Sequence, residues 1–487
     1  MADWLKRNEP RIFVDGRWQR PASGRAIDVV EPASGEVISQ IAAGNSQDIG
    51  AAVDAAQAAM ERSARGGWSP GQRQDALLAL AGAIEANAEE LAEIEMRDAG
   101  KPIGNVTRID VPQAAAGLRY FAGWATKLAG ETMSLSVPGN WHACTLREPV
   151  GVVGQIIPWN YPLMGAAMKI GPALAAGCAV VLKPAEQTSL SALRLAELFE
   201  GAGIPPGMVN VVPGFGGEAG AALVGHPGVA KIAFTGSTAT GRTIQRDASA
   251  QMKRVTVELG GKSPVVVMPD ADIDAAATAV AMNIFFNSGQ TCSAGSRLYV
   301  HASIADELVD KVTATASRMA VGDPADPATL LGPVISRAQM DRVSGFIDRA
   351  MNGGARCRVG GGRHEGRGFF VRPTVIDNVD GDMEVVREEI FGPVLAVQRF
   401  ESEDLDEIAA LANGGDYGLA AYVWTRDISK AFGLVQRIRA GTVRVNTGGG
   451  NDFAMPAGGV KQSGNGRENG RLGVEAYTEV KSLTIAI

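Results

Sequence analysis

The chain has 487 residues, of which 46% are hydrophobic and 20% charged, a composition typical of a globular protein with two or three folding units. Its formal net charge is −7, so no basic surplus exists to neutralise the phosphates of nucleic acids or anionic membranes, and we expect neither as a partner. The four cysteines show no CxxC pair and no metal-ligand spacing; they are Cys144, Cys178, Cys292 and Cys357. We therefore expect a reduced, cytoplasmic protein with no bound metal.

No segment predicts a secretory signal or a membrane span. The N-terminus, MADWLKRNEP, lacks an apolar core followed by a cleavage site. The longest apolar run, residues 170–182, contains Gly171, Pro172 and Gly177 and falls short of the roughly 20 apolar residues that a membrane helix needs. This run predicts buried α/β core instead.

The first hundred residues predict short strands followed by helices. Asp15-Gly16 suits a tight turn, so residues 12–18 predict a hairpin, and a second strand pair is expected over residues 28–41. Residues 47–99 then follow helical periodicity. Five apolar residues fall on one face of the predicted helices: Leu77, Leu80, Ile84, Leu91 and Ile94.

From about residue 150 the pattern alternates between strand and helix. The first alternation predicts a helix over residues 189–202 and strands at 152–157, 179–182, 208–212 and 231–234. The second predicts strands near 265–268, 297–300, 394–400, 420–424 and 443–446. Such alternation indicates parallel, doubly wound sheets, and two α/β domains in tandem usually place a site in the cleft between them. The stretch 479–487 alternates like a strand with no obvious local partner, so we expect it to pair with another subunit.

The segment FFNSGQTCSAGSR, residues 285–297, places Cys292 among small residues directly before a predicted strand. A cysteine in such a turn can present its thiol to a cleft, where the thiolate is a nucleophile. Most free cysteines are instead small buried hydrophobes, and this segment alone favours neither interpretation.

Two further polar residues have settings that suit acid–base and oxyanion chemistry. Glu258 lies in an otherwise apolar strand before a Gly-Gly pair, where its charged form is disfavoured and it could act as a general base near neutral pH. An edge-strand glutamate in a surface salt bridge is the commoner alternative. Asn160, between Pro158 and Pro162, could donate a hydrogen bond to an oxyanion, although Asn and Pro also favour a simple turn.

Together with four other stretches, these segments are similar to the aldehyde dehydrogenase superfamily, and the resemblance covers nearly the whole chain. The matching stretches are PWNYPL (158–163), KPAEQT (183–188), FTGSTATG (234–241), VELGGKSP (257–264), FFNSGQTCSAGSR (285–297), EEIFGPV (388–394) and GGVKQSGNGRENG (458–470). Seven blocks in the family's order are far more specific than any single motif. The resemblance implies that an aldehyde is oxidised to a carboxylic acid with reduction of NAD(P), through a cysteine thiohemiacetal and a thioester.

By this resemblance Cys292 is the nucleophile and Glu258 the general base. Asn160 and the backbone N–H of Cys292 are the oxyanion donors. Lys169 matches a helix lysine beside the catalytic centre, although a position on the helix surface is an alternative for it. A free thiol has a pKa near 8.5, and we expect the site to lower the pKa of Cys292.

The resemblance also places the cofactor. Residues 234–238 end a strand and open a helix whose N-terminus can face a pyrophosphate, whereas 214–220 has one residue too many for a GxGxxG fingerprint. Glu186 matches a position near the adenosine ribose, where a carboxylate would repel a 2′-phosphate, so NAD is favoured and NADP is possible. The expected cofactor-binding residues are Ile156, Pro158, Trp159, Lys183, Glu186, Gly216, Gly220, Phe234, Thr235, Gly236, Ser237, Leu259, Glu389 and Phe391.

The substrate pocket departs from the common family pattern. Many members have a bulky aromatic residue after Pro456, but here Ala457 follows and predicts a wider tunnel. We expect a bulky aromatic or medium-chain apolar aldehyde; the alternative is an amino-aldehyde or semialdehyde, with a cationic substrate attracted by Asp452. The expected pocket residues, from the 451–457 segment and elsewhere, are Tyr161, Met168, Phe286, Thr291, Ser293, Phe453 and Ala457.

The family fold is α/β, with a Rossmann-like cofactor domain, a second α/β catalytic domain and a small β-arm for oligomerisation. We place the cofactor domain at 1–127 and 149–260, the catalytic domain at 261–455, and the arm at 128–148 and 470–487, and we expect a homodimer or a homotetramer.

Two other functions stay open. A CoA-acylating relative would pass the thioester to CoA, but such enzymes generally lack the base that Glu258 supplies. A non-catalytic binding protein on the same scaffold would be expected to have lost Cys292 or Asn160.

Overall fold

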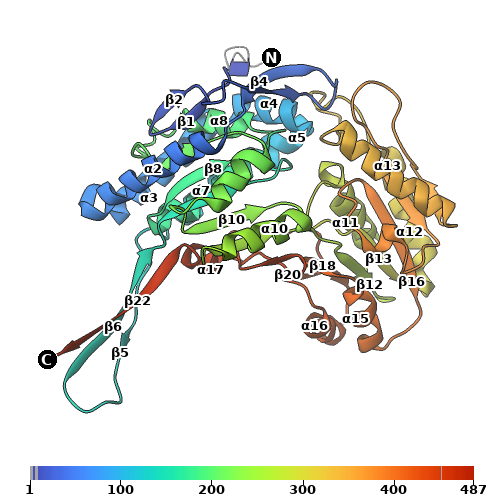
Figure 1. Ribbon diagram of the computed structural model, residues 1–487. Helices are drawn as coiled ribbons and strands as arrows, with labels where there is room; N and C mark the ends of the chain where they lie inside the picture. Colours follow the sequence, from blue (N-terminus) through green and yellow to red (C-terminus); the bar gives the residue numbers. More distant parts are fainter. Residues whose placement is uncertain (1–3, 6–8, 451) are drawn as a thin grey trace.

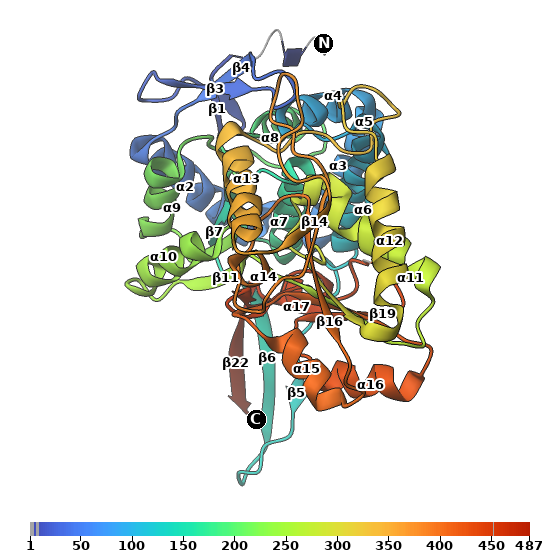
Figure 2. The same ribbon diagram turned by 90° about the vertical axis from the view of Figure 1, so that its right-hand side faces the viewer.

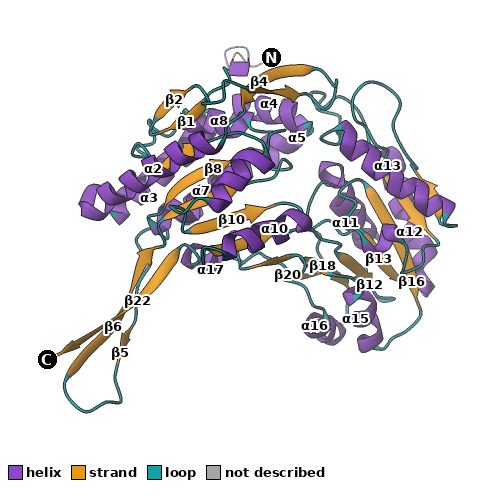
Figure 3. Cartoon of the chain, in the orientation of Figure 1, coloured by secondary structure: helices purple, strands orange, loops and turns teal. Residues whose placement is uncertain are grey.

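Two mainly parallel β-sheets form two lobes, and a narrow β-arm extends away from both (Figures 1 and 2). Helices pack on the faces of the sheets (Figure 3). The computed structural model describes residues 4–5, 9–450 and 452–487. Part of the N-terminal segment that was considered for a secretory signal, and Asn451 of the pocket segment, lie outside the described residues.

The first sheet has the strand order β2-β1-β9-β8-β7-β10-β11-β21, and its five strands from β9 to β11 are parallel. Its strands are β1 (Ile12–Val14), β2 (Arg17–Gln19), β7 (Val152–Ile156), β8 (Ala179–Lys183), β9 (Val209–Val211), β10 (Lys231–Thr235), β11 (Arg254–Glu258) and β21 (Gly464–Asn465). The four predicted parallel strands are confirmed. β8 and β9 follow β7 on one side and β10 and β11 lie on the other, so the strand order reverses between β7 and β10. Ligands of doubly wound sheets bind at the carboxyl ends of the strands beside such a reversal.

Helices cover this sheet and bury the predicted apolar face. They are α2 (Ser46–Arg62), α3 (Pro70–Ala86), α4 (Ala88–Ala99), α5 (Ile103–Asn105), α6 (Val111–Ala122), α7 (Pro162–Ala176), α8 (Leu190–Ala196), α9 (Ala221–Gly225), α10 (Thr238–Ser249) and α17 (Gly470–Glu475), with π-helical turns η1 (Ser63–Gly67), η2 (Val106–Asp110) and η3 (Gly216–Gly220). All five apolar residues predicted to share a face are buried in one core: Leu77, Leu80, Ile84, Leu91 and Ile94. The apolar run at 170–182 forms the end of α7 and most of β8, both buried.

One predicted helix is shorter than expected. We predicted a helix over residues 189–202, but α8 ends at Ala196. From there the backbone hydrogen bonds tighten, with Leu198 N–H donating to Leu195 O, and the chain continues in turns through two glycines of low helix propensity.

The second sheet has the order β14-β15-β16-β13-β12-β18-β19 and is parallel except at the β14 edge. Its strands are β12 (Pro264–Val267), β13 (Arg297–His301), β14 (Arg356–Val359), β15 (Thr374–Asp377), β16 (Val394–Phe400), β18 (Ala420–Trp424) and β19 (Thr442–Val445). Its helices are α11 (Ile273–Phe285), η4 (Phe286–Gly289), α12 (Ala302–Arg318), α13 (Arg337–Asn352), α14 (Glu384–Arg387), α15 (Leu405–Asn413) and α16 (Ile428–Arg437). The predicted second alternation is therefore confirmed.

The β-arm contains β5 (Thr132–Met133), β6 (Trp141–Pro149) and β22 (Thr478–Ala486). We expected the C-terminal strand, which has no obvious local partner in the sequence, to pair with another subunit; the structure also gives it a partner within the chain. β22 pairs antiparallel with β6 along its whole length, from Thr478 opposite Pro149 to Ala486 opposite Trp141. Sequence periodicity could not reveal this pairing because the two strands are more than 300 residues apart.

Two small sheets and a hairpin complete the fold. β3 (Ala26–Val30) pairs with β4 (Val37–Ala42), as predicted, and β17 (Tyr417–Gly418) pairs with β20 (Val460–Lys461). The β1–β2 hairpin turns at Asp15 and Gly16, whose φ angles of 52° and 73° are the left-handed values that a tight hairpin turn requires. Within the described ranges, no helix is both long and apolar enough to cross a membrane.

Candidate active site

A cavity of about 2000 Å³ lies between the carboxyl ends of strands β7, β10 and β11 of the first sheet and the amino ends of strands β13, β16 and β18 of the second. Segments from both lobes line it: the loop after β7, the turn after β10, the end of β11, and the loop before β13. Small-molecule sites usually measure roughly 300–1,000 Å³, so this cavity has room for two ligands side by side. The position beside the strand-order reversal of the first sheet is the one expected for a cofactor.

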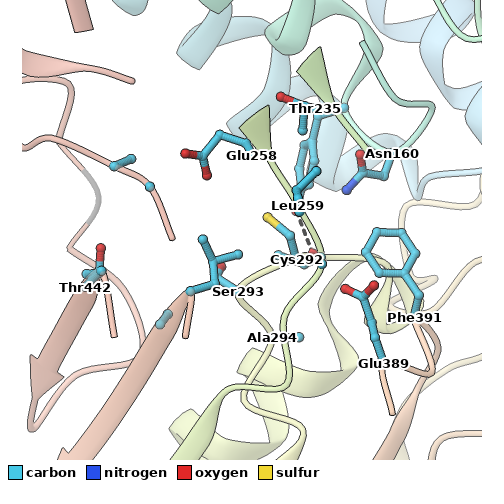
Figure 4. A pocket seen from close by; sticks show the side chains of 18 of the residues that line it. Asn160, Thr235, Glu258, Leu259, Cys292, Ser293, Ala294, Glu389, Phe391 and Thr442 are labelled. Carbon is cyan, nitrogen blue, oxygen red and sulfur yellow. Dashed lines mark hydrogen bonds between the residues drawn. The ribbon is translucent and has the colours of Figure 1, made fainter. Parts of the chain in front are cut away.

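The three predicted catalytic residues face this cavity from three separate segments (Figure 4). Cys292 follows a turn in which Asn287, Ser288 and Gly289 all have positive φ, at 51°, 54° and 72°. A Cβ at position 289 would stand 2.1 Å from the Gly392 carbonyl oxygen, so only glycine fits there. This tight turn directs Cys292 into the cavity, and the interpretation of Cys292 as a small core residue is not supported.

The pKa of the Cys292 thiol is not lowered, contrary to our expectation. Burial, and then the negative charges of Glu258 and Glu389, raise it to about 12. The sequence pattern predicted that Cys292 faces the cavity, but it could not predict that the charged groups around the thiol are negative. In this structure the thiol is therefore neutral at pH 7.

Asn160 is buried and held at both its side chain and its backbone. Its Nδ2 donates to the carbonyl oxygen of Gln290 at 2.9 Å. Its own carbonyl oxygen accepts from Lys101 Nζ and from Asn287 Nδ2, both at 3.2 Å. A simple exposed turn would not have these contacts. The side-chain amide of Asn160 is therefore held in one position in the cavity that Cys292 also lines.

Glu258 ends β11 and points into the cavity (Figure 4). It is not an exposed edge residue, because β21 pairs beyond it with Gly464 opposite Glu258. Its Oε1 is buried and has no hydrogen-bond partner in the described part of the chain. Burial, and then the negative charge of Glu468, raise the pKa of Glu258 to about 8. A carboxyl group with this pKa can accept and return a proton near neutral pH.

Glu468 is a functional candidate that our sequence analysis did not identify. Lys169, buried on α7, forms an ion pair with it, and both residues line the cavity near Glu258. Lys169 is therefore not a surface residue of its helix. Glu468 lies within the matched block 458–470 and is the only carboxylate residue in that block. This carboxylate in a matched block was the sequence feature that could have identified it.

The predicted cofactor residues divide into two groups. Eight line the cavity: Pro158, Trp159, Thr235, Gly236, Ser237, Leu259, Glu389 and Phe391. Six do not line it: Ile156, Lys183, Glu186, Gly216, Gly220 and Phe234. Three of these six lie at or next to the carboxyl ends of the parallel strands β7, β8 and β10, where they shape the edge of the sheet.

The cavity-lining group contains features that suit a dinucleotide. Ser237 caps α10 by accepting a hydrogen bond from Thr240 N–H at 3.2 Å, so the positive end of this helix opens toward the cavity. Glu389 accepts from Gly261 N–H at 2.9 Å, and burial raises its pKa to about 7. Phe391 packs edge-on against Trp159 with ring centroids 5.2 Å apart.

At the carboxyl end of β8, the strand beside β7, Lys183 and Glu186 form an ion pair. Lys183 Nζ donates to Gly214 O at 2.7 Å and lies 3.3 Å from Glu186 Oε2. A side chain at Gly220 would contact the stem of Lys183 at 3.5 Å. The residues predicted to lie near the adenosine ribose, Lys183 and Glu186, are thus in contact with each other and lie outside the large cavity.

All seven predicted substrate-pocket residues line the cavity: Tyr161, Met168, Phe286, Thr291, Ser293, Phe453 and Ala457. The hydroxyl groups of Tyr161 and Thr291 are 2.8 Å apart, beside Cys292. Ala457 exchanges two backbone hydrogen bonds of 2.7 Å with Glu468, which ties the pocket segment to the residue next to the base.

A buried ion cluster supports the Asn160 loop from behind. Lys101 pairs with Asp110 and lies 3.6 Å from Glu95, and all three are almost completely buried. Its Nζ also lies 3.8 Å from the centre of the Tyr161 ring. This cluster was not predicted, although Glu95 directly follows Ile94, a residue of the predicted buried face.

The comparisons with known proteins agree with this geometry. The aldehyde dehydrogenase family matches residues 18–483. The chain therefore belongs to the aldehyde dehydrogenase family, the enzymes that oxidise an aldehyde to a carboxylic acid with a nicotinamide cofactor. The fold class inferred from the sequence is confirmed with it.

Particular relatives are similar over almost their full length. The mitochondrial aldehyde dehydrogenase of Homo sapiens is 45% identical over 484 residues, covering 98% of this chain and 92% of the relative. Retinal dehydrogenase 2 of Mus musculus is 44% identical with the same coverage. An NAD+ complex of aldehyde dehydrogenase from Bacillus cereus has a TM-score of 0.96 at 43% identity and covers 99% of this chain and 97% of its own. A mutant of the indole-3-acetaldehyde dehydrogenase of P. syringae, in complex with NAD+ and IAA, has a TM-score of 0.96 at 41% identity, covering 100% and 99%.

Proposed function

We propose that this protein uses NAD to oxidise a bulky aromatic or medium-chain apolar aldehyde, with Cys292 as the nucleophile, Glu258 as the base and Asn160 as the oxyanion donor. The observation that carries the proposal is the convergence of these three side chains, from three separate segments, on one cavity between two α/β sheets (Figure 4). Glu258 has a pKa suited to a base near neutral pH, and the Asn160 amide is held in place by Gln290.

The first step joins the Cys292 sulfur to the aldehyde carbon. The thiol must lose its proton, and Glu258, whose buried carboxylate binds a proton readily, accepts it. The aldehyde oxygen becomes an oxyanion. Asn160 Nδ2 carries two hydrogens; Gln290 O accepts one and orients the amide, and the second is directed to the oxyanion together with the Cys292 backbone N–H.

The cofactor site fits NAD. Bound NAD would supply the hydride acceptor that converts the thiohemiacetal on Cys292 to a thioester. Ser237 at the start of α10 would face the pyrophosphate, and Glu389 would hold the nicotinamide ribose. Glu186, half-buried beside Lys183, would accept the hydrogen bonds of the adenosine ribose and disfavour a 2′-phosphate, so NADP is a weaker alternative.

The second half of the reaction releases the acid. Glu258 first releases the thiol proton to solvent and then removes a proton from a water molecule. The resulting hydroxide adds to the thioester carbon, and the Cys292 sulfur leaves and takes the proton that Glu258 now holds. The chain supplies this base within the cavity, so CoA is not needed as the acceptor. Lys169 and Glu468 flank Glu258 and set its proton affinity.

The shape of the pocket supports a bulky apolar aldehyde. Tyr161, Met168, Phe286 and Phe453 give it an apolar lining, and Ala457 presents only a methyl group. The carboxylate of Asp452, which would attract an amino-aldehyde, accepts a hydrogen bond from Ala454 N–H at 2.7 Å within its own exposed turn. Two relatives are named for bulky aldehydes, retinal and indole-3-acetaldehyde.

The assembly is part of the same proposal. The cofactor domain comprises residues 1–127 and 149–260, the catalytic domain 261–455, and the oligomerisation arm 128–148 and 470–487. Exposed apolar side chains along the arm support a homodimer or homotetramer; they include Met133, Trp141, Val480, Leu483 and Ile485. The low cysteine count supports a cytoplasmic location.

An assay of NADH and acid formation without added CoA tests the proposal. The wild-type enzyme should oxidise benzaldehyde-type substrates, and Cys292→Ala should abolish turnover while it still binds NAD. Cys357→Ala is the matched control, because Cys357 lies on β14 outside the cavity. A tenfold or greater preference in kcat/KM for cationic amino-aldehydes would contradict the substrate assignment, and persistent activity of Cys292→Ala would contradict the nucleophile.

A further inference from the structure

Gly117 lies in the middle of α6, buried behind the side chain of Met168. α6 packs along α7, which carries Met168 (Figure 2). A Cβ at position 117 would stand 2.0 Å from Met168 Cε and 3.1 Å from its Sδ. It would also stand 3.4 Å from Cε1 of Phe453. The end of the methionine therefore occupies the recess that the missing side chain leaves in α6.

The Met168 side chain is packed against protein on the side of α6 and faces the cavity on the other side. Met168 and Phe453 both line the cavity, whereas Gly117 does not. One turn further along α7, a Cβ at Gly171 would stand 2.9 Å from Phe121 and 3.4 Å from Leu118, so the interface of the two helices is closely packed there. A Met168 side chain expelled from the recess would therefore move into the cavity.

We propose that Gly117 is a specificity-determining residue: by holding the end of Met168 in the wall, it keeps the tunnel wide enough for an aldehyde with a bulky aromatic group. This inference rests on the proposed function and adds a residue that never touches the substrate. Its effect passes through Met168, a flexible side chain that can change position without unfolding the helices.

Gly117→Ala is the direct test. Alanine is the better helix former, so the substitution favours α6, and the atoms it displaces are the far end of a flexible side chain. The measured quantity is the ratio of kcat/KM for 2-naphthaldehyde to kcat/KM for acetaldehyde. One methylene in a pocket changes such ratios by about 10- to 200-fold, and we expect the ratio to fall at least tenfold.

Gly82→Ala is the matched control. Gly82 lies within α3, is half-buried, and has no atom within 4 Å of the position of an added Cβ. It undergoes the same chemical change in another helix of the same lobe. Its ratio should stay within twofold of the wild-type ratio.

Met168→Ala gives a second test that does not depend on the folding of Gly117→Ala. If the methionine already lies in the wall, its removal should change the wild-type ratio much less than it changes the ratio in the Gly117→Ala background. In the Gly117→Ala background the same removal should raise the ratio at least tenfold, because Met168 then obstructs the tunnel.

Two results would overturn the inference: a folded Gly117→Ala enzyme whose ratio lies within twofold of wild type, or a Met168→Ala enzyme whose ratio alone rises tenfold or more. Measurements of the same two aldehydes with the wild-type enzyme distinguish a failure of this inference from a failure of the proposed function. If wild type prefers acetaldehyde but Gly117→Ala still lowers the ratio tenfold, the proposed substrate class fails and the role of Gly117 stands.

Discussion

Replacing Lys101 with methionine removes the central charge of the ion cluster behind the active site. In the folded chain its Nζ pairs with buried Asp110, donates to the carbonyl oxygen of Asn160 at 3.2 Å, and lies 3.8 Å from the centre of the Tyr161 ring. Methionine has a similar length but no charge and no donor. The substitution therefore leaves the Asp110 carboxylate buried without its cation.

The cost follows from this arrangement. Lys101 and Asp110 have side-chain exposures of only 1% and 0%, so solvent cannot replace the lost partner. Breaking a buried ion pair at one side costs about 3–5 kcal/mol, because an uncompensated charge stays in the interior. We expect Lys101→Met to lower the free energy of unfolding by that amount. Asp110→Asn in the same chain should recover at least half of the loss, because it removes the unpaired charge.

Activity should fall as well, because Asn160 loses one of the two hydrogen bonds to its carbonyl oxygen. A displacement of about 1 Å in a catalytic group can cost roughly 100-fold in rate. We expect kcat to fall by about 10- to 100-fold with a smaller change in KM for the aldehyde. Urea unfolding at pH 7 and the single-turnover rate of NADH formation measure the two effects. A loss of stability below 1 kcal/mol, or a folded variant with the wild-type single-turnover rate, would refute the reasoning.

Four further predictions concern the base and the arm. Glu258→Gln should slow thioester hydrolysis more than thioester formation, so rapid mixing should show a burst of NADH; normal steady-state turnover without a burst would exclude Glu258 as the base. In wild type the hydrolysis rate should rise with pH through about 8, because only ionised Glu258 acts as the base. Glu468→Gln removes a charge that raises the pKa of Glu258, so this rise should move to lower pH; an unshifted pH–rate profile would contradict that role. Leu483→Asp, on the exposed part of the arm, should reduce the molar mass measured by light scattering, whereas an unchanged mass would argue against the arm as an interface.

Local patterns in the sequence predicted what local physics determines. Asp15-Gly16 can adopt left-handed φ angles, so the hairpin could be inferred from two residues. Leu77, Leu80 and Ile84 recur at helical spacing, so their shared buried face could be inferred as well. The catalytic candidates were found because Cys292 and its neighbours belong to ordered blocks with a family resemblance. Their convergence on one cavity required the fold.

The features that were missed all depend on contacts between distant segments. β22 pairs with β6, and periodicity carries no information about which strands pair. Lys101 meets Asn160, 59 positions away, and Lys169 meets Glu468, 299 positions away. Our expectation for the pKa of Cys292 was wrong in direction for the same reason, because burial in the fold, and then carboxylates from other segments, raise it. Sequence spacing shows which groups exist but not which charges become neighbours.

The pKa values of Cys292 and Glu258 have a common cause, and this links nucleophile and base. Both groups are buried, which raises their pKa values, and a neighbouring carboxylate contributes to the rise in each case. The thiol has the higher pKa, so in the resting site it keeps its proton and is a weak nucleophile. A positive charge bound in the same cavity would lower both values, because it favours the anionic form of each group.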